Sequence, residues 1–241
     1  MLIKTQAIVL KTLKFGESQL IIDLFTESIG CVSFIHPLLK TKRNRMGKQF
    51  FQPLTLLEIE FDSKQNDRLH RFKDIRIAYP FVSLPFDPYK QAIALFIAEF
   101  LYHCLRSEQQ SPSLYRYVVT SINWLDASEN SFSNFHLVFM MHFSRFIGFY
   151  PNLENYRRDD FFDLRDGIFC SSIPLHPDYV VPAEAAKINL LMRMNYESMH
   201  LFRFSRQERN RCIDLILHYY RLHIPAFPKL KSQAVLQELF R

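Results

Sequence analysis

Two short apolar runs separated by a turn constrain this chain more than any other feature of its sequence. Residues 7–10 read AIVL and residues 20–25 read LIIDLF, and both runs are rich in β-branched side chains. Residues 15–18 between them, FGES, include the glycine and serine that turns favour. A third apolar run follows Gly30. The pattern predicts three strands of one sheet, over about residues 5–13, 18–26 and 31–39.

Two further strands are expected before residue 80. One covers about residues 51–61 and the other about 69–78, with the polar turn SKQND at residues 63–67 between them. Five short strands in a segment of this length are typical of a small closed barrel, and the five-stranded oligonucleotide-binding (OB) fold is the candidate. The fold by itself does not establish function, because one fold hosts many activities.

The same region carries most of the net positive charge of the chain. Residues 1–80 hold 13 Lys and Arg against 8 Asp and Glu, a net charge of +5, whereas residues 81–241 hold 17 against 16. Residues 40–48, KTKRNRMGK, contain five positive charges and no negative one. A charge run is usually a solvated face, but a basic excess confined to one region favours a polyanion partner for it.

A nucleic-acid site in this barrel would combine cations for phosphates with aromatic rings for bases. Phe15 is the ring that we expect to stack on bases, because it adjoins the turn at Gly16; most other phenylalanines nearby must form the core. Arg71 and Lys73 belong to a second basic group on the fifth strand. The spacing of this group is irregular, so the sequence does not indicate which face of the strand its side chains share. The expected DNA-binding residues are Lys11, Lys14, Phe15, Lys40, Lys42, Arg43, Arg45, Lys48, Arg71 and Lys73.

The periodicity becomes helical after the prolines at positions 80, 85 and 88. We therefore predict an α+β chain with an OB-fold domain, residues 1–80, and an all-helical domain, residues 81–241. Asp87 can cap the first helix, and Ser205 with Glu208 forms a capping-box pattern. Helices are expected from Pro88, over about 112–126, 133–147 (ended by Gly148), 182–194 and 205–223, and from about 232, with a non-helical insertion at 151–181 that contains a hairpin.

No segment of the sequence predicts export or a membrane span. The first residues lack an apolar segment followed by a cleavage site, and the apolar stretch 92–105 is interrupted by Glu99 and His103. The cysteines are far apart and form no C-x-x-C pair. We expect a cytoplasmic, nucleoid-associated protein with buried reduced thiols at Cys31, Cys104, Cys170 and Cys212.

Catalytic chemistry is not visible in the sequence. Phosphate-cradling glycine motifs, a G-x-S-x-G elbow and an H-E-x-x-H pair are all missing, and the chain has only five glycines. The carboxylates between residues 159 and 166 could collect a hard cation, but the arginines interleaved with them favour a solvated, self-neutralising loop. These carboxylates are Asp159, Asp160, Asp163 and Asp166.

The amino-terminal motifs resemble those of the bacterial recombination mediator family RecO. The resemblance rests on AIVL, GES and LFTESIG, followed by the basic loop and by FFQPLTLLEIEF. It continues to the end of the chain through IGFYPNLENY and KLKSQAVLQELF. It implies a non-enzymatic protein that binds single- and double-stranded DNA, anneals complementary strands, and acts with RecR to load RecA onto DNA coated by single-strand-binding protein.

The resemblance also concerns metal. Many members of the family hold a zinc ion in the middle segment with four cysteines. Here residues 155–181 keep only Cys170, and Tyr156 stands about where the first ligand would fall. One thiol cannot form a tetrahedral structural site, so we predict no zinc and no other cofactor.

The resemblance further implies that the helical domain binds the acidic, apolar carboxy-terminal tail of single-strand-binding protein. Phe139 belongs to an apolar stripe of the helix predicted at 133–147 that could line a groove, although such a stripe is more often core. The arginine pair of relatives is replaced by apolar residues and His136. Cations that could substitute are Arg145, the leading candidate, and Arg116, Lys229 and Lys231.

Two other function classes stay open. An OB-fold factor that binds RNA or the ribosome would use the same stacking chemistry, since bases stack alike on either sugar. A metal-dependent nuclease would use the carboxylates at 159–166. Comparing DNA with RNA binding, with and without magnesium, separates all three.

Overall fold

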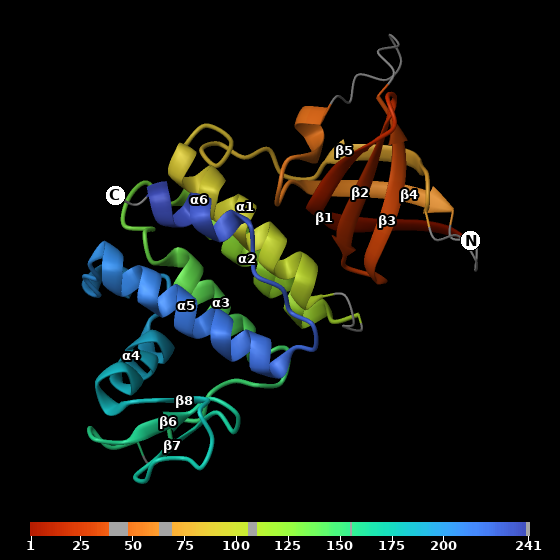
Figure 1. Cartoon of the computed structure of the whole chain (residues 1–241). Helices are drawn as coiled ribbons and strands as arrows, with labels where there is room; N and C mark the ends of the chain where they lie inside the picture. Colours follow the sequence, from red (N-terminus) through yellow and green to blue (C-terminus); the bar gives the residue numbers. More distant parts are fainter. Residues whose placement is uncertain (39–47, 63–68, 106–109, 155, 240–241) are drawn as a thin grey trace. The chain divides into compact units, whose positions relative to one another are not determined.

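The long strand β1 (Leu2–Phe15) organises the amino-terminal sheet of the computed structural model, which describes residues 1–38, 48–62, 69–105, 110–154 and 156–239 (Figure 1). Its first half pairs antiparallel with β4 (Leu56–Asp62) and its second half with β2 (Gln19–Thr26). β3 (Gly30–Pro37) extends the sheet from β2, and β5 (Phe72–Ile77) extends it from β4. The order is β3-β2-β1-β4-β5, and the five predicted strands are confirmed.

The sheet is OB-like but is not closed by a continuous ladder. Among the described residues, its two edges meet at one isolated parallel bridge, between Phe34 of β3 and His70, just before β5. There the amide of Ile35 donates to the carbonyl of His70 (2.9 Å), and the amide of His70 donates to the carbonyl of Ser33 (2.9 Å). A partly open five-stranded barrel is the form that this fold ordinarily takes. The prediction of a closed barrel is thus corrected to a curled sheet with one bridge.

Alternate residues of the strands fill the barrel. Ala7 and Val9 of β1 point inward and are completely buried, because successive side chains of a strand face opposite sides. Phe34 packs between other rings, stacked on Phe72 at 4.2 Å and edge-on to Phe61 at 5.0 Å between ring centroids. Burying rings of this size is a large part of the hydrophobic stabilisation available to a small barrel.

The fourth strand begins later than predicted. Residues 48–51 form a 3-10 turn, η1 (Lys48–Phe51), and Leu54 follows with a φ of +64°. Pro53 has no amide proton for a strand ladder, and the regular strand starts only at Leu56, after the amide of Leu54 donates to the carbonyl of Val9 at 2.8 Å. The turn instead places the side chain of Phe51 in the barrel core. The carbonyl of Phe51 accepts the hydroxyl of Thr12 at 2.9 Å.

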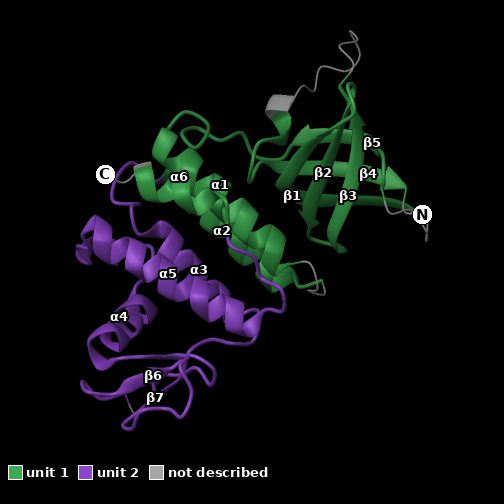
Figure 2. Ribbon diagram, viewed as in Figure 1, with its two compact units in different colours: residues 1–127, 230–239 green, residues 128–229, 240–241 purple. Residues whose placement is uncertain are grey.

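Three helices belong with the barrel in one compact unit, residues 1–127 and 230–239, which we call unit 1 (Figure 2). They are α1 (Pro88–Cys104), α2 (Pro112–Ala127) and α6 (Ser232–Leu239). Asp87 caps α1 as predicted, accepting the amides of Tyr89 and Lys90. The carboxylate of Glu99 on α1 accepts the amides of Lys231 (3.0 Å) and Ser232 (2.8 Å), so one helix caps the start of another.

The second compact unit, residues 128–229 among those described, is called unit 2 (Figure 2). The capping box at Ser205 and the hairpin with its turn at Gly167 (φ +67°) are confirmed. The elements of unit 2 are α3 (Phe135–Phe143), β6 (Phe161–Asp163), β7 (Ile168–Cys170), β8 (Tyr179–Val180), α4 (Pro182–Arg193), η2 (Met199–Leu201) and α5 (Arg206–His223).

Helix α3 ends four residues before the predicted end at Ile147. The hydroxyl of Ser144 donates to the carbonyl of Met141 at 2.7 Å, and short turns follow instead of a further helical turn. Side chains that bond to the local backbone in this way compete with helix continuation. Gly148, with a φ of +88°, lies in the following loop.

In the described part of the chain, no helix has both the length and the apolarity needed to cross a bilayer.

A buried polar cluster fixes the segment between barrel and α1. Asp126, at the end of α2, is 3% exposed, and its carboxylate accepts the amides of Val82, Ser83 and Leu84 at 2.7–2.9 Å. The ammonium of Lys90, itself 2% exposed, donates to the hydroxyl of Ser83 (2.6 Å) and the carbonyl of Asp126 (3.0 Å). Burial alone would raise the pKa of Asp126, but the three amides and the nearby ammonium lower it below its usual value.

The substitution Asp126→Asn should therefore destabilise the protein by about 1–3 kcal/mol, because an amide group would face a backbone N–H. Because the pKa of Asp126 is lowered on folding, its contribution is complete above the unfolded-state pKa of about 3.9 and is lost as pH falls through the folded-state value. Denaturant unfolding of wild type and variant should show a difference at pH 7 that shrinks below pH 4. The exposed Asp159→Asn is the control, and an equal loss in both variants would contradict the assignment.

Candidate nucleic-acid interface

The hairpin between β1 and β2 presents the predicted stacking residue to solvent. Gly16 has a φ of +61°, a backbone conformation that L side chains rarely adopt, and it turns the chain after Phe15. Phe15 is 53% exposed and Leu13 is 46% exposed. A ring so exposed at a barrel hairpin is free to stack on a base, because it is not part of the barrel core.

The two lysines of this hairpin lie on opposite faces of the strand. Lys11 pairs in register with Asp23 and shares the outward face with Leu13 and Phe15, while Lys14 pairs with the buried Leu20. Lys14 is exposed because it lies at the rim, beyond the core. The sequence prediction grouped Lys11, Lys14 and Phe15, and the structure brings only Lys11 and Phe15 onto one face.

Lys11 makes a contact that the sequence does not indicate. Its ammonium lies 4.2 Å above the ring centroid of Tyr102, a residue near the end of α1. Cations over aromatic faces are attracted by the ring quadrupole. Tyr102 was missed by sequence reasoning, since nothing in a helical pattern tells which strand residue will meet a given ring.

Most of the main basic loop lies outside the described residues. Lys40, Lys42, Arg43 and Arg45 lie outside the described residues, and so does the side chain of Lys48, although its backbone begins η1. Their role stays a prediction. On β5 the ammonium of Lys73 pairs with Asp62 (2.8 Å) and Arg76 pairs with Asp74 (3.2 Å), so carboxylates offset part of the second basic group. Arg71 is exposed just before β5.

The residues predicted to receive an apolar tail are divided between the units. Arg116 and Lys231 belong to unit 1, while Phe139, Arg145 and Lys229 belong to unit 2. Phe139 is 0% exposed and lies in the core, stacked between Phe135 and Phe143, so it lines no open groove. The guanidinium of exposed Arg145 lies 4.2 Å above the ring of Tyr150 and donates to its hydroxyl at 2.9 Å.

The acidic loop differs from the solvated loop that we predicted. Asp160 and Asp163 are 5% and 7% exposed, because their carboxylates accept amides of their own turns: Arg157 for the first, and Arg165 and Asp166 for the second. The second oxygen of Asp163 lies 3.0 Å from Nε2 of His176. No group of three ligand residues that could hold a metal ion occurs within the described ranges.

The cysteines are partly different from expectation. All four are free, and Cys104 and Cys212 are buried as expected. Cys170 is half-buried and Cys31 is exposed, because β3 places it on the outward face of the sheet, opposite Phe25.

Two family models match this chain. The model described as "Recombination protein O N terminal" matches residues 1–81, and "Recombination protein O C terminal" matches residues 85–234. The chain belongs to the RecO family. "DNA repair protein RecO" of Phocaeicola vulgatus is 50% identical over 240 residues, and that of Bacteroides fragilis strain ATCC 25285 is 48% identical over 241. A third, of Flavobacterium psychrophilum, is 33% identical over 242 residues.

Each of these RecO relatives is covered completely, and each covers this chain completely. The resemblance stated from the amino-terminal motifs is thereby confirmed over the full length. This RecO-family chain accordingly has a role in DNA repair and recombination.

The hairpin insertion of this RecO chain is held by ion pairs, a hydrogen bond and ring packing. Asp178 pairs with Arg165 (2.6 Å), and its other oxygen lies 3.6 Å from Nε2 of His218 on α5. Tyr219 of α5 donates its hydroxyl to the carbonyl of Phe149 at 2.8 Å and packs near Phe162 (6.1 Å between centroids). These contacts join the insertion to α5 within unit 2.

The carboxylate of Asp163 is expected to stabilise the hairpin insertion. Asp163→Ala should lower the free energy of unfolding by about 1–3 kcal/mol, since two turn amides and His176 lose their acceptor. Asp166→Ala, which removes an exposed carboxylate from the same turn, is the control, and thermal unfolding of both variants is the measurement.

The prediction of no zinc is checked by thermal unfolding of the protein with and without EDTA. The melting temperature should be the same in both. One zinc ion per chain in elemental analysis, or a melting temperature lowered by EDTA, would refute the prediction of no zinc.

Proposed function

We propose that this RecO-family protein binds single- and double-stranded DNA through its barrel and anneals complementary strands. With RecR it would help to load RecA onto DNA coated by single-strand-binding protein. The observation that carries the proposal is the exposed Phe15 on an OB-like barrel, beside lysines and within residues 1–80, which have a net charge of +5. Strands two and three and the first hairpin loop are where this fold binds oligonucleotides.

The role that we propose is non-enzymatic. Bringing DNA strands together requires that phosphate repulsion be reduced and bases be exposed, and neither step needs bond chemistry. Lysines and arginines on the barrel would serve the first need, and Phe15 the second. A nuclease role is not favoured, because the carboxylates of Asp160 and Asp163 are committed to backbone amides and to His176.

RNA binding is the second candidate, since a ring such as Phe15 stacks on bases of either nucleic acid. Fluorescence anisotropy with DNA and RNA of one sequence, with and without magnesium, decides between them. A stronger affinity for DNA and no cleavage support the proposal; preference for RNA would replace it. Cleavage that disappears on Asp160→Ala would establish the nuclease instead.

The basic loop generates a quantitative expectation. Affinity for DNA of any sequence should fall with salt by about 0.7–0.9 log units per log unit of salt for each phosphate contacted. Replacing Lys42, Arg43 and Arg45 with Ala should weaken binding to all sequences and lower this slope. The measurement is a salt titration by anisotropy on several sequences.

The control for that variant removes the same charge elsewhere. Replacing Lys4, Arg165 and Arg211 with Ala also lowers the net charge by three, but each of these side chains is paired with a carboxylate. The control should keep the wild-type salt slope. If the loop variant binds like wild type, or if both triple variants lose affinity equally, the loop assignment fails.

Binding of the tail of single-strand-binding protein belongs to the same proposal, with Arg145 supplying the cation. A labelled tail peptide should bind the full chain and lose affinity at high salt, because one charge pair anchors it. Arg145→Ala should weaken binding several-fold, while Arg221→Ala removes an exposed charge of the same unit as a control. Absence of binding to the wild-type chain at tens of micromolar peptide would remove this part of the proposal.

A further inference from the structure

The outward face of β1 changes character at a bulge. Before it, Ile8 is completely buried, and its register partner Phe25 contacts the ring of Tyr115 on α2 at 5.5 Å between centroids. The register then jumps from Val9 to Lys11, which leaves Leu10 as the extra residue. Beyond the bulge the outward residues are Lys11, Leu13 and Phe15, which we call the outer strip.

The outer strip combines a cation, an apolar centre and an exposed ring. Leu13 lies opposite Ile21, and Phe15 lies opposite Gln19, so the neighbouring strand adds apolar and neutral polar surface. The four residue-to-residue steps from Lys11 to Phe15 span about 13 Å. A strip of this length can contact a phosphate at its Lys11 end and a base at its Phe15 end.

The strip suits a single strand better than a duplex. A ring such as Phe15 gains stacking energy only from a base that is not already stacked between neighbours. In a duplex the bases are stacked inside and the outer surface offers phosphates, so only the cation of the strip would be used. Binding along the whole strip therefore requires a flexible single strand.

The cation of the strip lies over the ring of Tyr102. The Lys11 ammonium, 4.2 Å above its ring, is drawn to the junction of β1 and α1, both of which belong to unit 1. A lysine side chain otherwise samples many rotamers, and ordering it opposes binding of a phosphate. A contact that orders the ammonium before DNA arrives reduces this cost. His103 lies edge-on to Tyr102, at 5.0 Å between ring centroids.

We propose that Tyr102 is a positioning residue, which orders Lys11 as the phosphate contact of a single-strand subsite formed by the outer strip. The inference rests on the proposed DNA binding and extends that site from the hairpin to α1. The carboxylate of Asp23, which faces Lys11 in register and accepts the hydroxyl of Ser33, repels phosphates and limits the affinity of the subsite.

The test measures binding of labelled oligo-dT and of a duplex by anisotropy over a salt series, using the full chain. Tyr102→Leu should weaken oligo-dT binding about two- to fivefold, the range expected for loss of one exposed cation–π contact. Tyr102→Phe should bind like wild type, because the ring is kept. Lys11→Ala should lower the salt slope for oligo-dT by about 0.7, the loss of one single-strand phosphate contact.

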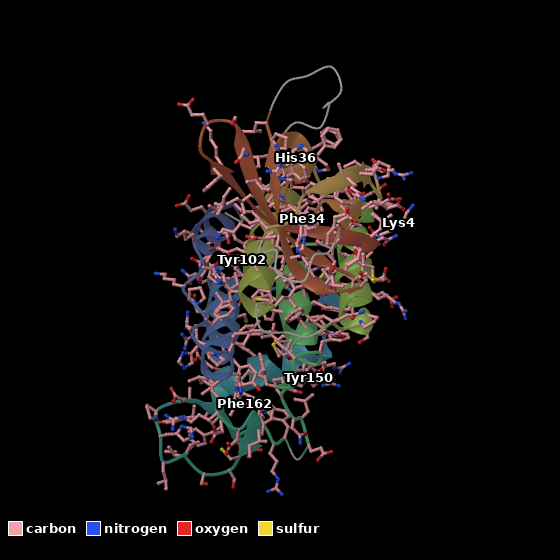
Figure 3. All side chains as sticks on the ribbon, turned by 90° about the vertical axis from the view of Figure 1, so that its right-hand side faces the viewer. Lys4, Phe34, His36, Tyr102, Tyr150 and Phe162 are labelled. Atoms are coloured by element: carbon pink, nitrogen blue, oxygen red, sulfur yellow. The ribbon has the colours of Figure 1, made fainter. Side chains whose placement is uncertain are left out.

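The double variant separates positioning from a general effect on structure. If Tyr102 acts through Lys11, then Lys11→Ala with Tyr102→Leu should bind no more weakly than Lys11→Ala alone. Asp23→Asn should strengthen binding of oligo-dT. Lys4→Ala is the matched control, since it removes a lysine from the same strand whose ammonium is paired with Glu60 at 3.2 Å. In Figure 3 the labels of Lys4 on β1 and Tyr102 on α1 stand well apart, at the right and left of the view.

Each remaining outcome has a defined meaning. If wild type binds oligo-dT and Lys11→Ala weakens it while Tyr102→Leu does not, the positioning role is overturned and the proposed function stands. The same holds if the effects of the two substitutions add in full, or if Tyr102→Phe binds as weakly as Tyr102→Leu. If wild type binds neither oligo-dT nor duplex, the proposed function and the subsite both fail.

Discussion

The pairing of β1 with two partners is the interaction on which the rest of unit 1 depends. Its first half forms backbone hydrogen bonds with β4 and its second half with β2, so one strand joins the two halves of the curled sheet. The same strand turns Ala7 and Val9 into the barrel and Ile8 outward beneath helical side chains. Loss of its register by one residue would exchange these faces, exposing the barrel core and burying Lys11.

The elements predicted most reliably were those with strong local signals. Alternation along β1, the cap at Asp87 and the capping box at Ser205 depend on neighbours in sequence, and the structure contains all of them. The errors came from competition between local and tertiary demands. Pro53 delayed β4, and the hydroxyl of Ser144 ended α3 before the apolar pattern did.

The candidate site was predictable in composition but not in geometry. Phe15 could be singled out because a phenylalanine beside a glycine turn has little core to join, and it is indeed exposed. Alternation alone puts Lys11 and Lys14 on opposite faces, but the bulge at Leu10, which no propensity reveals, decides that Lys11 is the one that faces outward. The contact between Lys11 and Tyr102 joins residues 91 positions apart. The contact of Asp163 with His176 likewise depends on the tertiary fold and could not be predicted from local sequence.

The chain passes from unit 1 into unit 2 and back, and the cap that Glu99 provides fixes the returning helix α6 to α1. Unit 2 leaves unit 1 after α2 and returns to it before α6, so it is tethered at both of its boundaries. A single cut within unit 2 would therefore leave two pieces, each still anchored in unit 1. A truncation at residue 229 would remove α6 as well and leave the Glu99 carboxylate without its amides. Domain excision in this protein therefore means joining residue 127 to residue 230 rather than stopping the chain early.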